Sequence, residues 1–171
     1  MKKRLVSMLL VLVMVLGMLP VTALAASSEE EALGEVNIYN GEQKLSYLSI
    51  NGRIRELIYT YFNHVDANGR TKEIPAYCVN PNIYGVPQTV GPGESIKYLA
   101  EEKASDPKVV GIISNGYPHR SLGELGLENK YQAFYATKMA LWYYLIPSWD
   151  ISNLKVAPGL SGSELDIGNR I

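Results

Sequence analysis

The chain has 171 residues and one cysteine, and its 16 lysines and arginines nearly balance its 17 aspartates and glutamates. Three of the basic residues occupy positions 2–4, so the rest of the chain is mildly acidic and has no obvious basic surface for nucleic acid or anionic lipid. The length is sufficient for one domain with a core but not for two. A single cysteine cannot form a disulfide within the chain. An exported protein with one cysteine usually buries the thiol, uses it in a reaction or holds it in a covalent bond.

The first 25 residues have the composition of a cleavable secretory signal peptide. A positive segment (residues 2–4) precedes an almost unbroken apolar run (residues 5–19), and Ala23-Leu24-Ala25 provides an A-x-A cleavage site. The apolar run is shorter than the ~20 residues that a transmembrane helix needs, and an uncleaved N-terminal anchor is the alternative. We predict cleavage after Ala25, no membrane insertion of the mature chain, and a secreted, extracellular protein at a bacterial surface.

Residues 26–35 are small and then acidic, which is typical of a flexible leader. The domain itself is expected over residues 36–171. Its first part alternates apolar and polar residues, as in strands with one buried face, and the Asn-Gly pairs at 40–41 and 51–52 predict turns.

Two further strands complete a predicted antiparallel meander. Residues 53–62 are rich in β-branched and aromatic side chains, and a turn follows at 66–69. The next strand is predicted over residues 73–79, with Cys78 inside it. Frequent glycines and prolines then predict a loop over residues 80–93.

The second half of the chain favours helices. Asp106 before a proline, followed by Gly116, predicts a short helix over residues 107–115. A weak strand signal covers residues 154–156, and a Gly/Ser-rich loop is expected after it. Strands separated from helices in this way indicate an α+β fold, in which an antiparallel meander or sandwich portion packs against a buried helix that covers the strand bearing Cys78.

The buried helix is predicted over residues 128–145, because Pro147 stops it and disfavours helical geometry at Ile146. Its apolar residues recur at i, i+3, i+4 and i+7. They are Tyr131, Phe134, Tyr135, Leu141, Trp142 and Leu145. Lys138 lies at the centre of this stripe, and the opposite face is hardly more polar. An ammonium group in that position must reach solvent along its stem, find a partner or lose its proton.

Two short motifs resemble those of a known family. One is Tyr77-Cys78-Val79, and the other, within the predicted long helix, is Ala136-Thr137-Lys138-Met139-Ala140-Leu141-Trp142. They are similar to the Y-C-hydrophobic and A-T-Q-x-A-hydrophobic-W motifs of the thioester (TQxA) domains of Gram-positive surface adhesins. Thr137, Ala140 and Trp142 match the second motif and support the resemblance.

The resemblance implies a chemistry. In this family the cysteine sulfur attacks the glutamine carboxamide, ammonia leaves and an internal thioester remains, which amines of a host or extracellular-matrix protein then attack. A strand facing a buried helix would keep water from that bond. The resemblance implies attachment rather than enzymatic turnover, with no cofactor and no metal. Such domains continue with more strands, a stalk and a wall anchor, and the resemblance allows that this chain stops short of them.

Lys138 occupies the place of the family's glutamine. A lysine has no acyl carbon, so Cys78 cannot form a thioester with it, and a nearby ammonium would instead make the cysteine more reactive. Gln132 is the alternative acyl donor, ~120° round the helix from Lys138. The leading hypothesis is an exported adhesin-type module whose thioester is lost or altered, and the second is a functional thioester that uses Gln132.

The third hypothesis is an enzyme, a secreted cysteine hydrolase. It would need His64 or His119 as a base for Cys78, and both histidines lie in polar, turn-like contexts. No motif for metal ligands, paired catalytic carboxylates or a phosphate-binding glycine loop stands out in the sequence. The hydrolase needs an imidazole beside the thiol, whereas the adhesin hypothesis needs residue 138 there.

Overall fold

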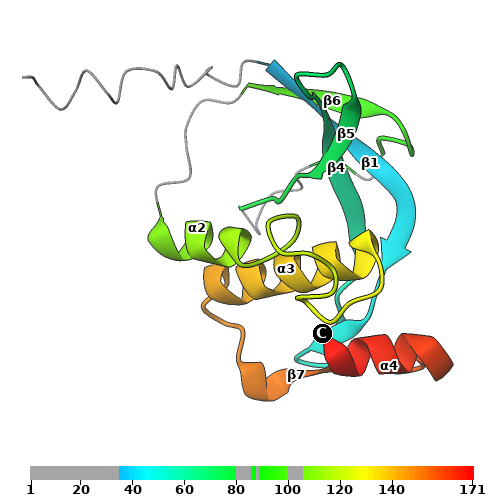
Figure 1. The fold of residues 1–171 in the computed structure, drawn as a ribbon. Helices are drawn as coiled ribbons and strands as arrows, with labels where there is room; N and C mark the ends of the chain where they lie inside the picture. The colour runs from blue at the N-terminus through cyan, green and yellow to red at the C-terminus, as the bar shows by residue number, and fades with distance from the viewer. Residues whose placement is uncertain (1–34, 80–85, 88, 100–105) are drawn as a thin grey trace, which may run out of the picture. The chain divides into compact units, whose positions relative to one another are not determined.

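A four-stranded antiparallel sheet forms the first layer of the fold (Figure 1). In the computed structural model, which describes residues 35–79, 86–87, 89–99 and 106–171, its strands follow the order β5-β4-β1-β6. The strands are β1 (Glu35–Leu45), β4 (Leu57–Val65), β5 (Thr71–Pro75) and β6 (Ser95–Leu99). The predicted signal peptide and residues 26–34 of the predicted leader lie outside the described residues, and Glu35 already belongs to β1.

A second, three-stranded antiparallel sheet has the order β3-β2-β7. It consists of β2 (Leu48–Ile50), β3 (Arg53–Ile54) and β7 (Leu154–Val156). The turn between β2 and β3 is the predicted Asn-Gly turn, with positive φ angles at both Asn51 and Gly52, as a tight hairpin turn requires. The strand predicted over residues 53–62 is therefore two strands, β3 and β4, in different sheets.

The turn predicted at Asn40-Gly41 is wrong, because β1 passes straight through this pair. The pairing of β1 with β4 shifts register between Asn40 and Lys44, so the strand has a bulge instead of a turn. Asn40 is buried, and its Nδ2 donates to the Val90 carbonyl at 3.0 Å. Gly41 allows the close approach of Tyr59, whose carbonyl oxygen would lie 3.2 Å from an added Cβ.

The strand predicted over residues 73–79 is wrong beyond Pro75, where β5 ends. Ala76 still binds Thr60 of β4, through its backbone N–H (2.8 Å) and its carbonyl oxygen (2.6 Å). Past Ala76 the side chain of Tyr77 packs into the core instead of continuing the edge of the sheet. Cys78 therefore follows a strand and does not belong to one.

Among the described residues, three α-helices accompany the sheets: α2 (Pro107–Ser114), α3 (Lys130–Leu145) and α4 (Gly162–Arg170), with a short 3-10 helix at Ile151–Asn153. The Asp106 carboxylate caps α2 by accepting from two backbone N–H groups, as the sequence predicts. Asn129 caps α3 in the same way. The helix therefore begins at Lys130, two residues later than the predicted start at residue 128. The helix α4 and the strand β6 were not predicted, and α4 lies where a loop was expected.

The helix α3 is the centre of the packing. It contacts α2, β1 and β4, and Figure 1 shows α2 alongside it. The core joins α3 to both sheets through Leu45, Leu48, Ile50, Leu57, Tyr59, Phe134, Tyr135, Met139 and Trp149. The fold is thus α+β with antiparallel sheets. No helix among the described residues has the length and apolar content needed to cross a membrane.

Tyr135 links α3 to the second sheet through two hydrogen bonds. Its hydroxyl accepts from the backbone N–H of Leu48 (3.0 Å) and lies 2.8 Å from the carbonyl oxygen of Arg55, to which it donates. The ring is fully buried, so water does not replace these bonds if the hydroxyl is lost.

Replacing Tyr135 with phenylalanine should lower the free energy of unfolding by ~1–3 kcal/mol, because it leaves a buried N–H without an acceptor. Tyr143→Phe is the control on the same helix, since Tyr143 is exposed. Urea denaturation of both variants measures the difference. Equal stabilities of the two variants would contradict this role of Tyr135.

Candidate functional site

The segment that carries Cys78 lies along α3 and is anchored at two points. The Tyr77 ring stacks on Phe134, with centroids 5.0 Å apart, and its hydroxyl donates to the Tyr117 carbonyl at 2.7 Å. The Cys78 carbonyl accepts from the indole Nε1 of Trp142 at 3.0 Å. Phe134 and Trp142 are eight residues apart on one face of the helix, so the segment spans about two turns of α3.

Lys138 lies midway between these two anchors. Its Nζ is 5.3 Å from the ring centroid of Phe134 and 5.0 Å from that of Trp142, so both rings offer their π faces to the ammonium group. The residue is only 7% exposed. The structure therefore brings Lys138 to the segment that carries Cys78, a residue that is half-buried there.

The electrostatics of Lys138 are dominated by its burial. Desolvation lowers the pKa of the Lys138 ammonium from its ordinary value to about 8, and the charge interaction with Cys78 opposes this shift. Within the described part of the chain its Nζ lies over two aromatic faces and interacts electrostatically with Cys78, and no carboxylate contributes to its pKa shift. A substantial fraction of the amine is therefore neutral at mildly alkaline pH.

Thr137 fixes a turn against the same segment. Its hydroxyl donates to the Ala133 carbonyl (2.8 Å) and accepts from the backbone N–H of Tyr117 (3.0 Å). Gly116 is essential to this contact, since an added Cβ would lie 2.4 Å from the Thr137 methyl carbon. The Tyr117 carbonyl in turn accepts from Tyr77, so Thr137 and Tyr77 hold the two successive peptide groups on either side of the Tyr117 Cα.

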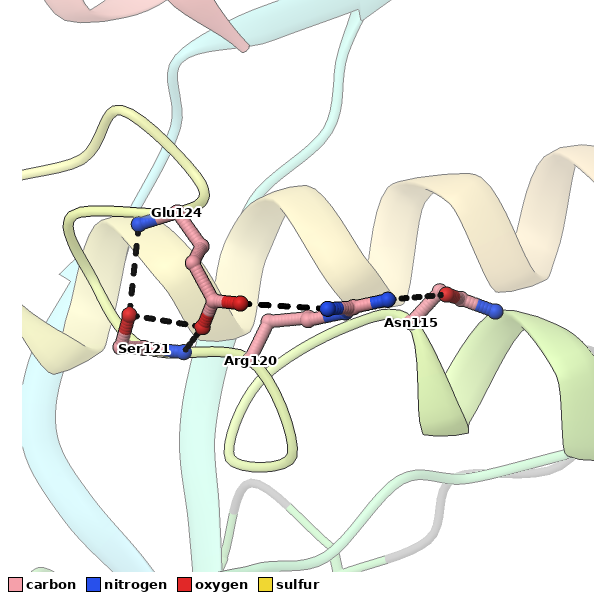
Figure 2. A network of polar contacts seen from close by, with 4 residues as sticks. All are labelled: Asn115, Arg120, Ser121 and Glu124. Carbon is pink, nitrogen blue, oxygen red and sulfur yellow. Dashed lines mark hydrogen bonds and ion pairs between the residues drawn. The ribbon is translucent and has the colours of Figure 1, made fainter.

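A surface network supports this turn from outside (Figure 2). Arg120 donates to the Glu124 carboxylate (3.1 Å) and to the side-chain oxygen of Asn115 (3.2 Å), which lie on either side of it in the sequence. Ser121 donates to Glu124 through both its backbone N–H and its hydroxyl, each at 2.8 Å. The network therefore ties the end of α2 to the start of the next loop and restrains the turn that contains Tyr117.

Gln132, the alternative acyl donor, is engaged at the beginning of α3. It is 1% exposed, and its Oε1 accepts from the backbone N–H of Glu128 at 3.0 Å. A side-chain hydrogen bond with the Glu128 carboxylate helps to hold the pKa of that carboxyl below its usual range, after the larger contribution of Arg170. Six residues of helix place Gln132 ~9 Å from Lys138 along the axis.

The other predicted site residues do not all meet at Cys78. Ala140 is exposed and lines an apolar recess of about 370 Å³ with Ala136 and Tyr143, on another side of α3. His64 is exposed in β4. It lies opposite Lys72 in the pairing of β4 with β5, at the end of β5 that is farther from Cys78 in the sequence. His119 is exposed in the turn after Tyr117.

The sequence reasoning missed Tyr117 as part of the site. Its backbone N–H and carbonyl group bind Thr137 and Tyr77, and any residue type except proline can supply these groups. The adjacent Gly116 was the available signal, because a glycine before a buried turn often marks a close backbone approach.

A family model described as "TED: Thioester domain" matches residues 75–162, about half of the chain and all of the site described above. The fold is similar to that of the thioester domain of the Enterococcus faecium TIE86 protein, with 21% identity and a TM-score of 0.52 over 80% of this chain and 47% of that chain. The Bacillus anthracis TIE protein is 22% identical, with a TM-score of 0.49 over 80% of this chain and 23% of that chain.

The chain thus spans less than half the length of these two solved structures. No curated protein matches it.

Replacing Lys138 with methionine should raise the stability, and the gain should shrink with pH. Burial holds the folded pKa near 8, below the unfolded value, so the unfolded chain binds more protons between these two values and the parent protein gains stability as pH rises through that window. The difference between the two proteins should narrow by roughly 2 kcal/mol from pH 7 to pH 10.

Urea denaturation at several pH values measures this difference, with Lys155→Met as the control because Lys155 is exposed in β7. A difference between parent and Lys138→Met that stays constant with pH would show that the Lys138 ammonium is solvated.

Proposed function

This chain belongs to the thioester domain family, and we propose that it is an exported, adhesin-type module in which Lys138 occupies the position of the family's glutamine. The single observation that carries the proposal is the position of the Lys138 amine, between the two rings that anchor the Cys78 segment. An acyl donor for the thiol would have to lie there, because proximity is what allows a thiol to attack a carboxamide.

The chemistry of this pair differs from that of a thioester. A thioester forms when a thiol replaces ammonia on a carboxamide carbon, and Lys138 offers an amine in place of that carbon. Gln132 has the necessary carboxamide, but it is hydrogen-bonded to Glu128 at the start of the helix. We therefore propose that the native domain forms no internal thioester.

The remaining architecture supports a binding module rather than an enzyme. The segment around Cys78 is held by Tyr77 and Trp142, and the adjacent turn is held by Thr137, so the surface around the site is rigid. Thioester domains attach to amine-bearing proteins in general. We propose that this module binds a protein surface of the same class, on a host cell or in the extracellular matrix, without the covalent bond.

The intact mass of the mature, reduced protein should equal the mass calculated from its sequence, and methylamine should add nothing. The Lys138→Gln variant should lose one ammonia, about 17 Da, and then react with methylamine, because a carboxamide now faces the thiol. The matched control is the double variant Lys138→Gln with Cys78→Ala, which should do neither.

Two outcomes would contradict this assignment. A native mass already short by one ammonia would mean that Gln132 or another residue supplies the acyl group. A folded Lys138→Gln protein that keeps its ammonia would mean that residue 138 does not occupy the position of the family's glutamine.

Export is a separate prediction, which rests on the first 25 residues. The secreted protein should begin at Ala26, because the A-x-A site ends at Ala25. N-terminal sequencing of protein recovered from the culture medium or the cell surface measures this. Material that begins at Met1 would contradict cleavage, and replacing Ala25 with a bulky residue should block processing.

A further inference from the structure

We infer that Cys78 and Lys138 form a redox-dependent cross-link, in which peroxide oxidises the thiol and a covalent bond then joins Sγ of Cys78 to Nζ of Lys138. The inference rests on the proposed function in one respect, since a thioester would already occupy the sulfur. It assigns to the pair a reaction of its own, a reversible modification, in place of the family's acyl chemistry.

The first argument is the geometry of the two anchors. Trp142 binds the Cys78 carbonyl through its indole N–H at 3.0 Å, and the face of the same indole lies 5.0 Å from the Lys138 Nζ. Phe134 stacks on Tyr77 and lies 5.3 Å from the same Nζ. The residues on which the amine lies therefore also hold the Tyr77 ring and the Cys78 carbonyl, so the fold brings the amine to the segment that carries the thiol before any reaction begins.

The second argument is the chemical character of the amine. Lys138 is 7% exposed, and among the described residues its Nζ lies over two aromatic faces in place of a carboxylate that would keep it protonated. Burial lowers its pKa to about 8. On the order of a tenth of the amine is then neutral at pH 7, and a neutral amine is the form that attacks an electrophilic sulfur.

The third argument concerns access. Cys78 is half-buried, whereas Lys138 is 7% exposed and its amine is shielded from bulk water. Hydrogen peroxide is the oxidant of the proposed reaction because it is a small molecule, suited to a half-buried residue. Cys78 and Lys138 are near enough to interact electrostatically, so the Lys138 amine is the nitrogen assigned to a sulfenic acid formed on Cys78. Sulfenic acids condense with thiols or with nitrogen, and the described part of the chain contains one cysteine.

The reaction balances in two steps. The thiol reacts with hydrogen peroxide to give a sulfenic acid and one water, so sulfur loses two electrons and the peroxide is reduced. The Lys138 nitrogen then attacks the sulfur, the S–N bond forms, the S–O bond breaks, and the hydroxyl leaves as water with one amine proton. A dithiol reductant reverses the reaction by taking the sulfur into a mixed disulfide and then closing its own disulfide, which restores the thiol and the amine.

The test uses the mature, reduced protein at pH 8, after removal of the reductant. Hydrogen peroxide should lower its intact mass by about 2 Da, the loss of two hydrogens, and should abolish thiol labelling. Peptide mapping should find one cross-linked pair that contains Cys78 and Lys138. Dithiothreitol should restore both the original mass and the labelling.

Lys138→Arg is the decisive variant, because it keeps a positive charge at this position and removes the nucleophilic amine. Its oxidation should stop at the sulfenic acid, which dimedone traps, or continue to the sulfinic acid. The matched control is Lys155→Arg, which should cross-link like the parent protein because Lys155 is exposed in β7.

The outcomes for this inference and for the proposed function are distinguishable. A protein that is short by one ammonia before peroxide is added would overturn both. A protein of unchanged mass that reacts with peroxide only to gain oxygen, to form a dimedone adduct or to make disulfide-linked dimers would overturn the cross-link alone. A loss of about 2 Da that persists in Lys138→Arg would show that another residue is the partner.

Discussion

The burial of α3 on nearly all sides is the constraint on which the rest of the structure depends. Both sheets, α2 and the Cys78 segment pack on this one helix, so each polar side chain along it needs a partner within the protein. Tyr135, Thr137 and Gln132 all find theirs in backbone groups, at Leu48, Tyr117 and Glu128. These three bonds attach α3 to three different parts of the chain, which explains how a helix with so many aromatic residues adopts one position.

Lys138 meets the same constraint differently. Its Nζ contacts the faces of Phe134 and Trp142, and such contacts compensate an ammonium only in part, which is consistent with its lowered pKa. A neutral carboxamide would cost less to bury at this position. We therefore expect the lysine to lower the stability of the fold, as the Lys138→Met variant tests. A glutamine would make the site an acyl donor, whereas the Cys78–Lys138 pair consists of two groups that seek electrophiles.

The sequence predicted the features that depend on local rules. Asp106 before a proline gave the start of α2, and Pro147 gave the end of α3, because caps and prolines act on their immediate neighbours. The features that depend on partners distant in sequence were missed. Asn40 lies inside β1 because the backbone at Val90 and Gly93 binds it there, and no pattern near residue 40 reveals this.

The same distinction between local features and features set by distant partners applies to the candidate site. Periodicity placed Lys138 on the buried stripe of α3, and its low exposure agrees with that prediction. The end of β5 was predicted too late, because Cys78 follows strand-like residues whose side chains turn toward α3 instead of alternating across a sheet. Which contacts hold Cys78 could not be predicted, since the indole of Trp142 binds a backbone carbonyl and the hydroxyl of Tyr77 binds another. Residue type leaves no signal for an acceptor that every residue has.

The motif in α3 has two faces, and this explains why its residues do not all meet at the cysteine. Positions 134, 138 and 142 are four residues apart and lie on one side of the helix, where they contact the Cys78 segment. Ala140 is two residues beyond Lys138, so it lies ~200° round the helix, and with Ala136 it lines the apolar recess. The alanines therefore line a recess on one side of the helix, while the aromatic residues and residue 138 face the Cys78 segment on the other.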